Sequence, residues 1–325
     1  MAILFAIEGA VSQGVLWGIM TLGVYLTFRI LDIADLTVDG SFATGGAISA
    51  VLLVAGWNPY LTLLISFFVV MITGLVTGFM NTKLKIHVLL ASILTQIALY
   101  SVNIRIMGKA NIPLLGVETC MSKLTKILPD CTVTTTSLII GVVFAAIVIA
   151  IMYWFFGTEL GSAIRATGNN EKMVRALGVN TDTMKILGLA LSNGLVALSG
   201  ALVAQSQGYA DVQMGVGTIV IGLASIIIGE VIFGKRFGMW WTLIAVVLGS
   251  IIYRIVIAVV LQLGLKSTDL KLLTALIVAI SLSVPVFKQK LFKKKITPEP
   301  EENTRHSNVI DIHKEKDSEK LQGEN

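Results

Sequence analysis

The chain is poor in charged residues, in histidine and in cysteine. Charged residues make up 14% of its 325 residues, whereas soluble domains carry about a quarter. It has 3 histidines and 2 cysteines, and His87 is the only histidine before residue 306. The motifs H-E-x-x-H and G-x-S-x-G are absent. Without a metal-ligand set or a nucleophile–base pair, we expect a protein that is not an enzyme and needs no metal or cofactor.

Apolar sequence, by contrast, is abundant. Apolar residues make up 55% of the chain, and the mean hydropathy is +0.83. Runs of about twenty residues without a charge match the thickness of a bilayer core. The predicted spans are 10–28, 41–55, 60–80, 86–102, 137–156, 186–203, 216–233, 238–261 and 270–287. We therefore predict an all-α, polytopic transmembrane helical bundle of about eight to ten spans, embedded in a lipid bilayer.

Basic residues gather in a few short segments between these runs. Lys83 and Lys85, the segment 165–185, and the pair Lys235 and Arg236 fall on one side if there are nine crossings, and we assign that side to the cytoplasm. No basic residue precedes Arg29, so the first run is interpreted as a retained span with an external N-terminus. This pattern does not indicate a nucleic-acid partner, despite the net charge of +5.

The chain divides into a predicted transmembrane domain, 1–287, and a polar tail, 288–325. The tail holds 9 of the 25 Lys and Arg residues, contains Pro and is poor in aromatic residues. Such a composition buries too little apolar surface to fold, so we predict a disordered cytoplasmic tail.

The stretch 32–49 carries three carboxylates followed by small residues. One interpretation is a cytoplasmic turn before a short helix, in which Asp39 caps that helix. The other is a broken helix that enters the bilayer and lines a cavity, where irregular backbone is tolerated. Because polar groups at membrane depth are candidates for function, we expect the substrate path to include the following residues. They are Asp35, Thr37, Asp39 and Ser41, with Asn193, Gln205 and Gln207 as weaker candidates.

The internal loop 158–185 is too polar to face lipid. Asn169 and Asn170 are placed to cap a short amphipathic helix that begins near Glu171, and Gly178 supplies its end. Met173, Val174 and Leu177 form the apolar stripe of this helix. Spacing alone leaves two alternatives open, a helix that docks into the groove of a partner and a helix that lies on the lipid surface.

The octapeptide at 229–236, GEVIFGKR, resembles a nucleotide-binding P-loop up to its last position. That position requires Ser or Thr to reach magnesium, and here it is Arg236. We conclude that the chain does not itself hydrolyse ATP.

Both cysteines, Cys120 and Cys131, lie in the loop 103–136, which the charge distribution places outside the cytoplasm. Disulfides persist in oxidising compartments, so the location permits a bond between them. Two free thiols are the alternative.

These patterns resemble a known family. The loop is similar to the cytoplasmic coupling segment of ABC importer permeases of the branched-chain amino acid, ribose and simple-sugar group. The stretch 35–47, DLTVDGSFATGGA, looks like the family's broken second helix, and most like a subgroup associated with tryptophan or tyrosine uptake. The resemblance covers about residues 10–287. The matching loop residues are Thr158, Gly161, Arg165, Ala166, Asn170, Ala176, Leu177, Gly178, Val179, Asn180 and Asp182, and Glu171 lies among them.

The resemblance implies a permease for a small solute, an aromatic or branched-chain amino acid, in the plasma membrane of a prokaryote. It implies a dimer of two such chains, a separate cytoplasmic ATP-binding subunit docked on 165–178, and an extracytoplasmic solute-binding protein. The residues alone leave a secondary transporter or channel as the alternative. Such a protein more naturally carries charges in the middle of its spans.

Overall fold

The computed structural model describes residues 2–127, 132–234 and 238–263, with a few positions between 272 and 283. In this part of the chain, seven helices are long and apolar enough to cross a membrane, and α10 is a shorter apolar helix. The helices are α1 (Ala2–Tyr25), the π-helical η1 (Leu26–Ile30), α2 (Thr37–Val54), α3 (Pro59–Thr82), α4 (Val88–Met107), α5 (Cys120–Ile127), α6 (Val133–Gly157), α7 (Glu159–Asn169), α8 (Glu171–Ala176), α9 (Thr181–Gln207), α10 (Thr218–Phe233) and α11 (Met239–Gln262). The predicted polytopic helical bundle is confirmed. The predicted span 270–287 lies mostly, and the tail 288–325 wholly, outside the described residues.

Local sequence sets the ends of several helices. The Asn58 side chain accepts a hydrogen bond from the Tyr60 N–H at 3.1 Å, with Pro59 as the first residue of α3. Gly108, with φ of +67°, ends α4. This helix runs beyond the predicted end at residue 102, because a helix need not stop where its sequence becomes polar at the membrane surface.

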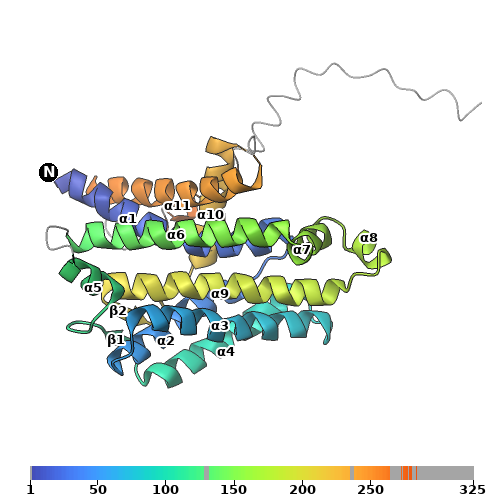
Figure 1. Ribbon diagram of the computed structural model, residues 1–325, viewed down its shortest axis with the longest axis horizontal. Helices are drawn as coiled ribbons and strands as arrows, with labels where there is room; N and C mark the ends of the chain where they lie inside the picture. Colours follow the sequence, from blue (N-terminus) through green and yellow to red (C-terminus); the bar gives the residue numbers. More distant parts are fainter. Residues whose placement is uncertain are drawn as a thin grey trace, which may run out of the picture. The chain divides into compact units, whose positions relative to one another are not determined.

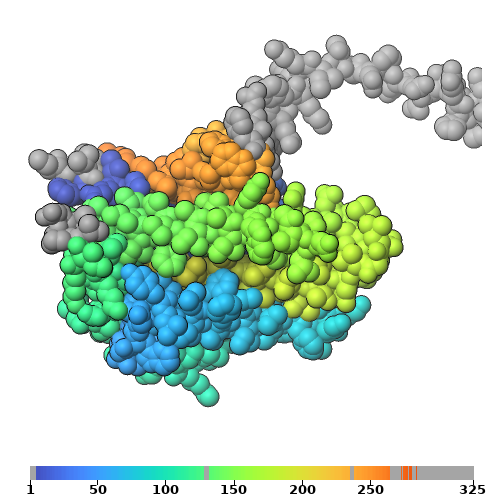
Figure 2. Space-filling model, in the orientation of Figure 1, coloured from blue at the N-terminus to red at the C-terminus, as the bar shows by residue number. Residues whose placement is uncertain are grey.

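The helix α9 lies at the centre of the bundle, between α1, α2 and α3. Its most apolar stretch is 83% buried, whereas those of α4 and α6 are only 28% buried and expose apolar side chains. Figure 2 shows α3 and α6 covering one face, with only a strip of α9 visible between them. An outer surface this apolar has no stable place in water, so the described bundle is that of a multi-pass membrane protein.

Glycines allow backbones to touch inside the bundle. A Cβ atom on Gly45 would lie 2.2 Å from the carbonyl oxygen of Ala197, and one on Gly200 would lie 2.0 Å from that of Phe42. These two contacts join α2 to α9. Close approach of this kind supplies the packing that holds helices together in lipid.

The two ends of the bundle differ. Figure 1 places α7 and α8 at one end, and α5 with the strands β1 (Asn111–Pro113) and β2 (Tyr209–Asp211) at the other. The two strands pair antiparallel, with Ile112 opposite Ala210. The charge pattern predicts that the α7–α8 end faces the cytoplasm.

The chain between η1 and α2 is irregular and runs inside the bundle. Asp32 has φ of +56°, and helical structure resumes only at Thr37. Asp35 is 1% exposed and bonded to Asn193, which lies near the middle of the 27-residue α9. Of the two interpretations of 32–49, the structure therefore favours a broken helix that enters the bundle.

Candidate functional site

The coupling segment, residues 158–185, contains two short helices. Asn170 caps α8 as expected, since its side chain accepts a hydrogen bond from the Met173 N–H at 3.1 Å. Gly178 follows α8 with φ of +85°, the conformation expected of a helix stop. The preceding helix, α7, was not anticipated from the sequence. Thr158 caps it, with an oxygen that accepts from the Gly161 N–H at 3.3 Å.

The glycines of α7 allow it to press against its neighbours. A Cβ atom on Gly161 would lie 2.1 Å from the carbonyl oxygen of Phe155, and one on Gly168 would lie 1.9 Å from that of Ile30. Ile164, between them, is fully buried. The helix α7 is therefore seated directly on the end of η1, from which the broken segment continues.

An ionic network fixes α8 to the start of α9. Glu171 accepts from the Lys185 Nζ at 2.7 Å and from the Arg175 Nη2 at 3.0 Å. The same Arg175 nitrogen donates to the Thr181 hydroxyl at 2.9 Å. The hydrogen bond from Lys185 lowers the pKa of Glu171, so this carboxyl group stays ionised at neutral pH. The coupling segment is thus anchored at both ends.

The apolar stripe predicted for the short helix is divided in the structure. Val174 is 2% exposed and packs inward, whereas Met173 is 49% and Leu177 is 74% exposed. Val174 lies at the inward edge of the stripe and packs on the bundle, while the other two members face outward. The exposed pair leaves an apolar spot at the tip of the coupling segment, and Arg175 and Ala176 are also exposed there.

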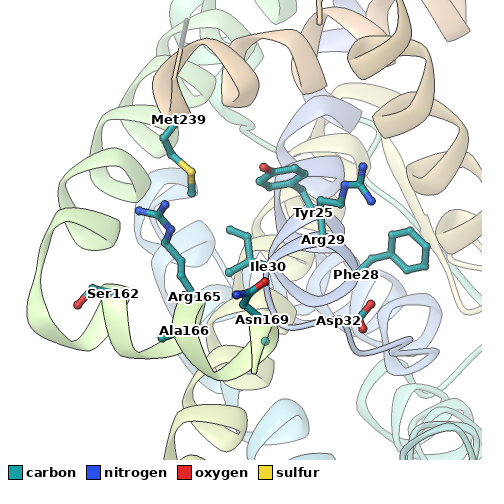
Figure 3. A pocket seen from close by; sticks show the side chains of 11 residues that line it. Tyr25, Phe28, Arg29, Ile30, Asp32, Ser162, Arg165, Ala166, Asn169 and Met239 are labelled. Carbon is teal, nitrogen blue, oxygen red and sulfur yellow. The ribbon is translucent and has the colours of Figure 1, made fainter. Parts of the chain in front are cut away.

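A cavity of about 810 Å³ opens beside α7. Figure 3 shows Arg165 extending from α7 toward Met239, with Tyr25 and Arg29 on the opposite wall. Arg29 donates two hydrogen bonds to Glu230, at 2.9 and 2.8 Å, and so ties η1 to α10. The coupling segment, η1 and the start of α11 therefore line one cavity, and the ion pair joins η1 to α10.

The first group of predicted path residues lies in the buried centre of the bundle. Asn193 donates to the Asp35 carboxylate at 2.8 Å and accepts from the Ser41 hydroxyl at 2.6 Å. Thr37 is bonded to Thr77 of α3 at 2.9 Å. The structure thus brings four of the predicted residues together. Their polar atoms are occupied by contacts between helices, and their role as contacts for a solute stays a prediction.

Asp39 links two helix beginnings. Its carboxylate accepts from the Gly217 N–H at 2.9 Å, the Ile219 N–H at 2.9 Å and the Thr218 hydroxyl at 2.8 Å. The sequence offered α2 as the helix that this carboxylate could cap. Its side chain caps α10 instead, because the first turn of α2, which follows the broken segment, lies against the start of α10.

The remaining two predicted path residues lie apart from this centre. Gln205 donates to Ser49 at 3.1 Å and to Thr62 at 3.2 Å, and accepts from the Cys120 N–H at 2.9 Å. It therefore joins three helices near the end that carries β1 and β2. Gln207 is exposed at the last position of α9.

Asn103 was not among the predicted site residues, and it is fully buried in α4. The predicted span ended at residue 102, so this residue was assigned to the loop. A test for an amide on the inward face of an extended helix would have found it.

Cys120 is buried in α5, and desolvation raises the pKa of its thiol to about 12. Cys131 lies outside the described residues, so the disulfide stays a prediction. In a Cys131→Ser protein, we expect Cys120 to resist a maleimide at pH 7, since the reactive thiolate forms only as the pH approaches the raised pKa. Mass spectrometry of the treated protein measures this. The same protein unfolded in detergent should react readily, and rapid labelling of the folded protein at pH 7 would contradict the burial.

The fold defines a class, that of multi-pass helical membrane proteins. A family model described as "Branched-chain amino acid transport system / permease component" matches residues 6–281. The chain belongs to this family, which is one of transport permeases and not of enzymes.

Two relatives extend this comparison. The chain is 39% identical over 272 residues to a "Tyrosine transport system permease protein" of Clostridioides difficile (strain R20291), covering 84% of this chain and 88% of the relative. It is 35% identical over 277 residues to an "Uncharacterized protein RP368" of Rickettsia prowazekii (strain Madrid E), covering 84% and 95%. No solved structure matches the chain.

Proposed function

We propose that this chain is the membrane-spanning subunit of an ATP-binding-cassette importer that takes up an amino acid with an aromatic or branched apolar side chain. It works as a homodimer in the plasma membrane of a prokaryote, without a cofactor of its own. A separate ATP-binding subunit docks at the tip of the coupling segment, and a solute-binding protein docks at the end that carries β1 and β2. The similarity to the tyrosine permease supports an aromatic solute.

The observation that carries this proposal is the construction of the coupling segment. An ATP-binding subunit can move a pore only through a connection that transmits force, so a loose loop would not serve. Here α8 is held by Glu171 and Lys185 at 2.7 Å, and α7 is seated on Ile30 through Gly168. The tip offers the exposed Met173 and Leu177 to a partner. A rigid polar segment with exposed apolar residues at its tip is suited to docking into a groove of the ATP-binding subunit.

The proposal predicts that docking depends on the apolar tip. A Leu177→Asp substitution should strongly reduce the amount of ATP-binding subunit that purifies with the permease, because it places a charge where an apolar contact forms. A Leu115→Asp protein is the matched control, since Leu115 is 92% exposed but lies in the loop between β1 and α5, at the other end.

Uptake of radiolabelled tyrosine into membrane vesicles completes this test. Uptake should require internal ATP, the ATP-binding subunit and the binding protein, and should be lost with Leu177→Asp. Uptake that an ion gradient drives without these subunits would contradict the proposal and favour a secondary transporter.

A further inference from the structure

A second pocket, of about 400 Å³, lies between the start of α2, the later half of α4 and the segment 212–217. It is separate from the cavity beside α7, and it lies toward the end of the bundle that carries β1 and β2. Its polar lining includes Asp39, Gln96 and Asn103, and its apolar lining includes Ile97, Tyr100 and Val216. A solute arriving from this end would reach the pocket before the buried centre of the bundle.

Asn103 is the unusual member of this lining. Its side chain is fully buried, yet neither the amide oxygen nor the amide nitrogen has a hydrogen-bond partner. The other two buried amides, Asn193 and Gln205, bond across helices through both atoms. Buried amides are nearly always paired, so an orphaned one calls for a ligand group that supplies a donor and an acceptor.

Asp39 sets the charge of the ligand. Among the described residues that line the pocket, it is the one with a formal charge, and no cationic side chain belongs to that lining. A carboxylate has about four acceptor positions, and α10 occupies three of those on Asp39. The remaining position can accept from an ammonium group. A free anion would be repelled, and a hard divalent cation prefers a larger set of oxygen ligands.

We propose that this pocket binds the transported solute as a zwitterionic amino acid with a large apolar or aromatic side chain. The ammonium group donates to Asp39 and to the Asn103 amide oxygen, the carboxylate accepts from the Asn103 amide nitrogen, and the side chain lies against Ile97, Tyr100 and Val216. This inference rests on the proposed function, because it names the solute class of the same transporter. It also places the solute on the carboxylate that joins α2 to α10.

Photolabelling of the purified full-length chain in lipid nanodiscs tests the pocket directly. The probe is 4-azido-L-phenylalanine, and the labelled peptides are identified by mass spectrometry. We expect adducts within 96–103 and 212–216 that excess L-tyrosine suppresses and L-glutamate does not. An Asn103→Leu protein should give about tenfold fewer adducts, the factor that corresponds to losing one good hydrogen bond.

Two controls keep the result interpretable. Gln13→Leu also removes an amide with an orphaned buried oxygen, but it lies in α1 outside the pocket, so labelling should be unchanged. The melting temperature of Asn103→Leu should stay equal to or above that of the wild type, since the substitution removes an unpaired buried polar group.

Specific outcomes overturn the inference. Equal labelling by 3-(4-azidophenyl)propanoate, which lacks the ammonium group, would show a groove that accepts lipid-like acids. Equal labelling of Asn103→Leu, or adducts only outside the pocket, would remove the assigned contacts while ATP-dependent uptake could still stand. Conversely, if the pocket is labelled but uptake does not depend on ATP, the binding site is supported and the proposed importer function is contradicted.

Discussion

Gly200→Ala is expected to prevent stable assembly of the bundle. The new methyl carbon would lie 2.0 Å from the carbonyl oxygen of Phe42, so α2 and α9 would have to separate. Overpacking of this kind costs up to about 3 kcal/mol and occasionally more. These helices are central, and their separation would also disturb the contact between Ser41 and Asn193. We expect a lower yield of membrane-inserted protein and a clearly lower melting temperature in detergent.

Gly9→Ala provides the control for this prediction. A Cβ atom on Gly9 meets nothing within 4 Å, and the residue lies within a helix. Alanine favours a helix over glycine by about 1 kcal/mol, so this protein should be at least as stable as the wild type. Equal melting of Gly200→Ala and the wild type would contradict the close approach of α2 and α9.

Gly168→Ala is expected to uncouple ATP hydrolysis from uptake. The added methyl carbon would lie 1.9 Å from the carbonyl oxygen of Ile30, so α7 would lift from the end of η1. The exposed side chains at the tip, Met173 and Leu177, are unaltered, and the ATP-binding subunit should still purify with the permease. A misplacement of about 1 Å can cost on the order of 100-fold in a positioned reaction. We therefore expect uptake to fall at least about tenfold while hydrolysis continues.

Gly157→Ala is the matched substitution, since a Cβ atom there meets nothing within 4 Å. Uptake and hydrolysis by this protein should both equal those of the wild type. If the ATP-binding subunit no longer purified with the Gly168→Ala protein, α7 would be part of the docking surface. It would then not act only by transmitting movement to η1. Unchanged uptake would show that the close contact between Gly168 and Ile30 is not required for coupling.

The helical bundle could be predicted from the sequence because the spans are long apolar runs separated by short polar or charged segments. The ends of the helix α8 could also be predicted from the sequence, since Asn170 and Gly178 act through backbone groups a few residues away. The helix α7 was not predicted, because Gly161 and Gly168 suggest flexibility when their neighbours are unknown. In the fold, they are sites of close contact.

The contacts of Asp39 and Asn103 could not be predicted from the sequence for a different reason. Asp39 binds Gly217 and its neighbours, nearly two hundred residues along the chain, through main-chain N–H groups that carry no sequence signature. Asn103 becomes a candidate binding residue only because three separate segments form a pocket around it. Sequence can identify a polar residue at depth, but its partners depend on how the helices are arranged.

The link between Asp39 and α10 also constrains the order in which the protein is made. The ribosome delivers α2 long before α10, and domains tend to fold from the N-terminus as they are synthesised. Until α10 meets Asp39, the N–H groups of Gly217 and Ile219 lack their acceptor, and such groups are costly in lipid. The helix α10 can therefore settle only against an α2 that is already in place, and α11, which packs on α10, must follow.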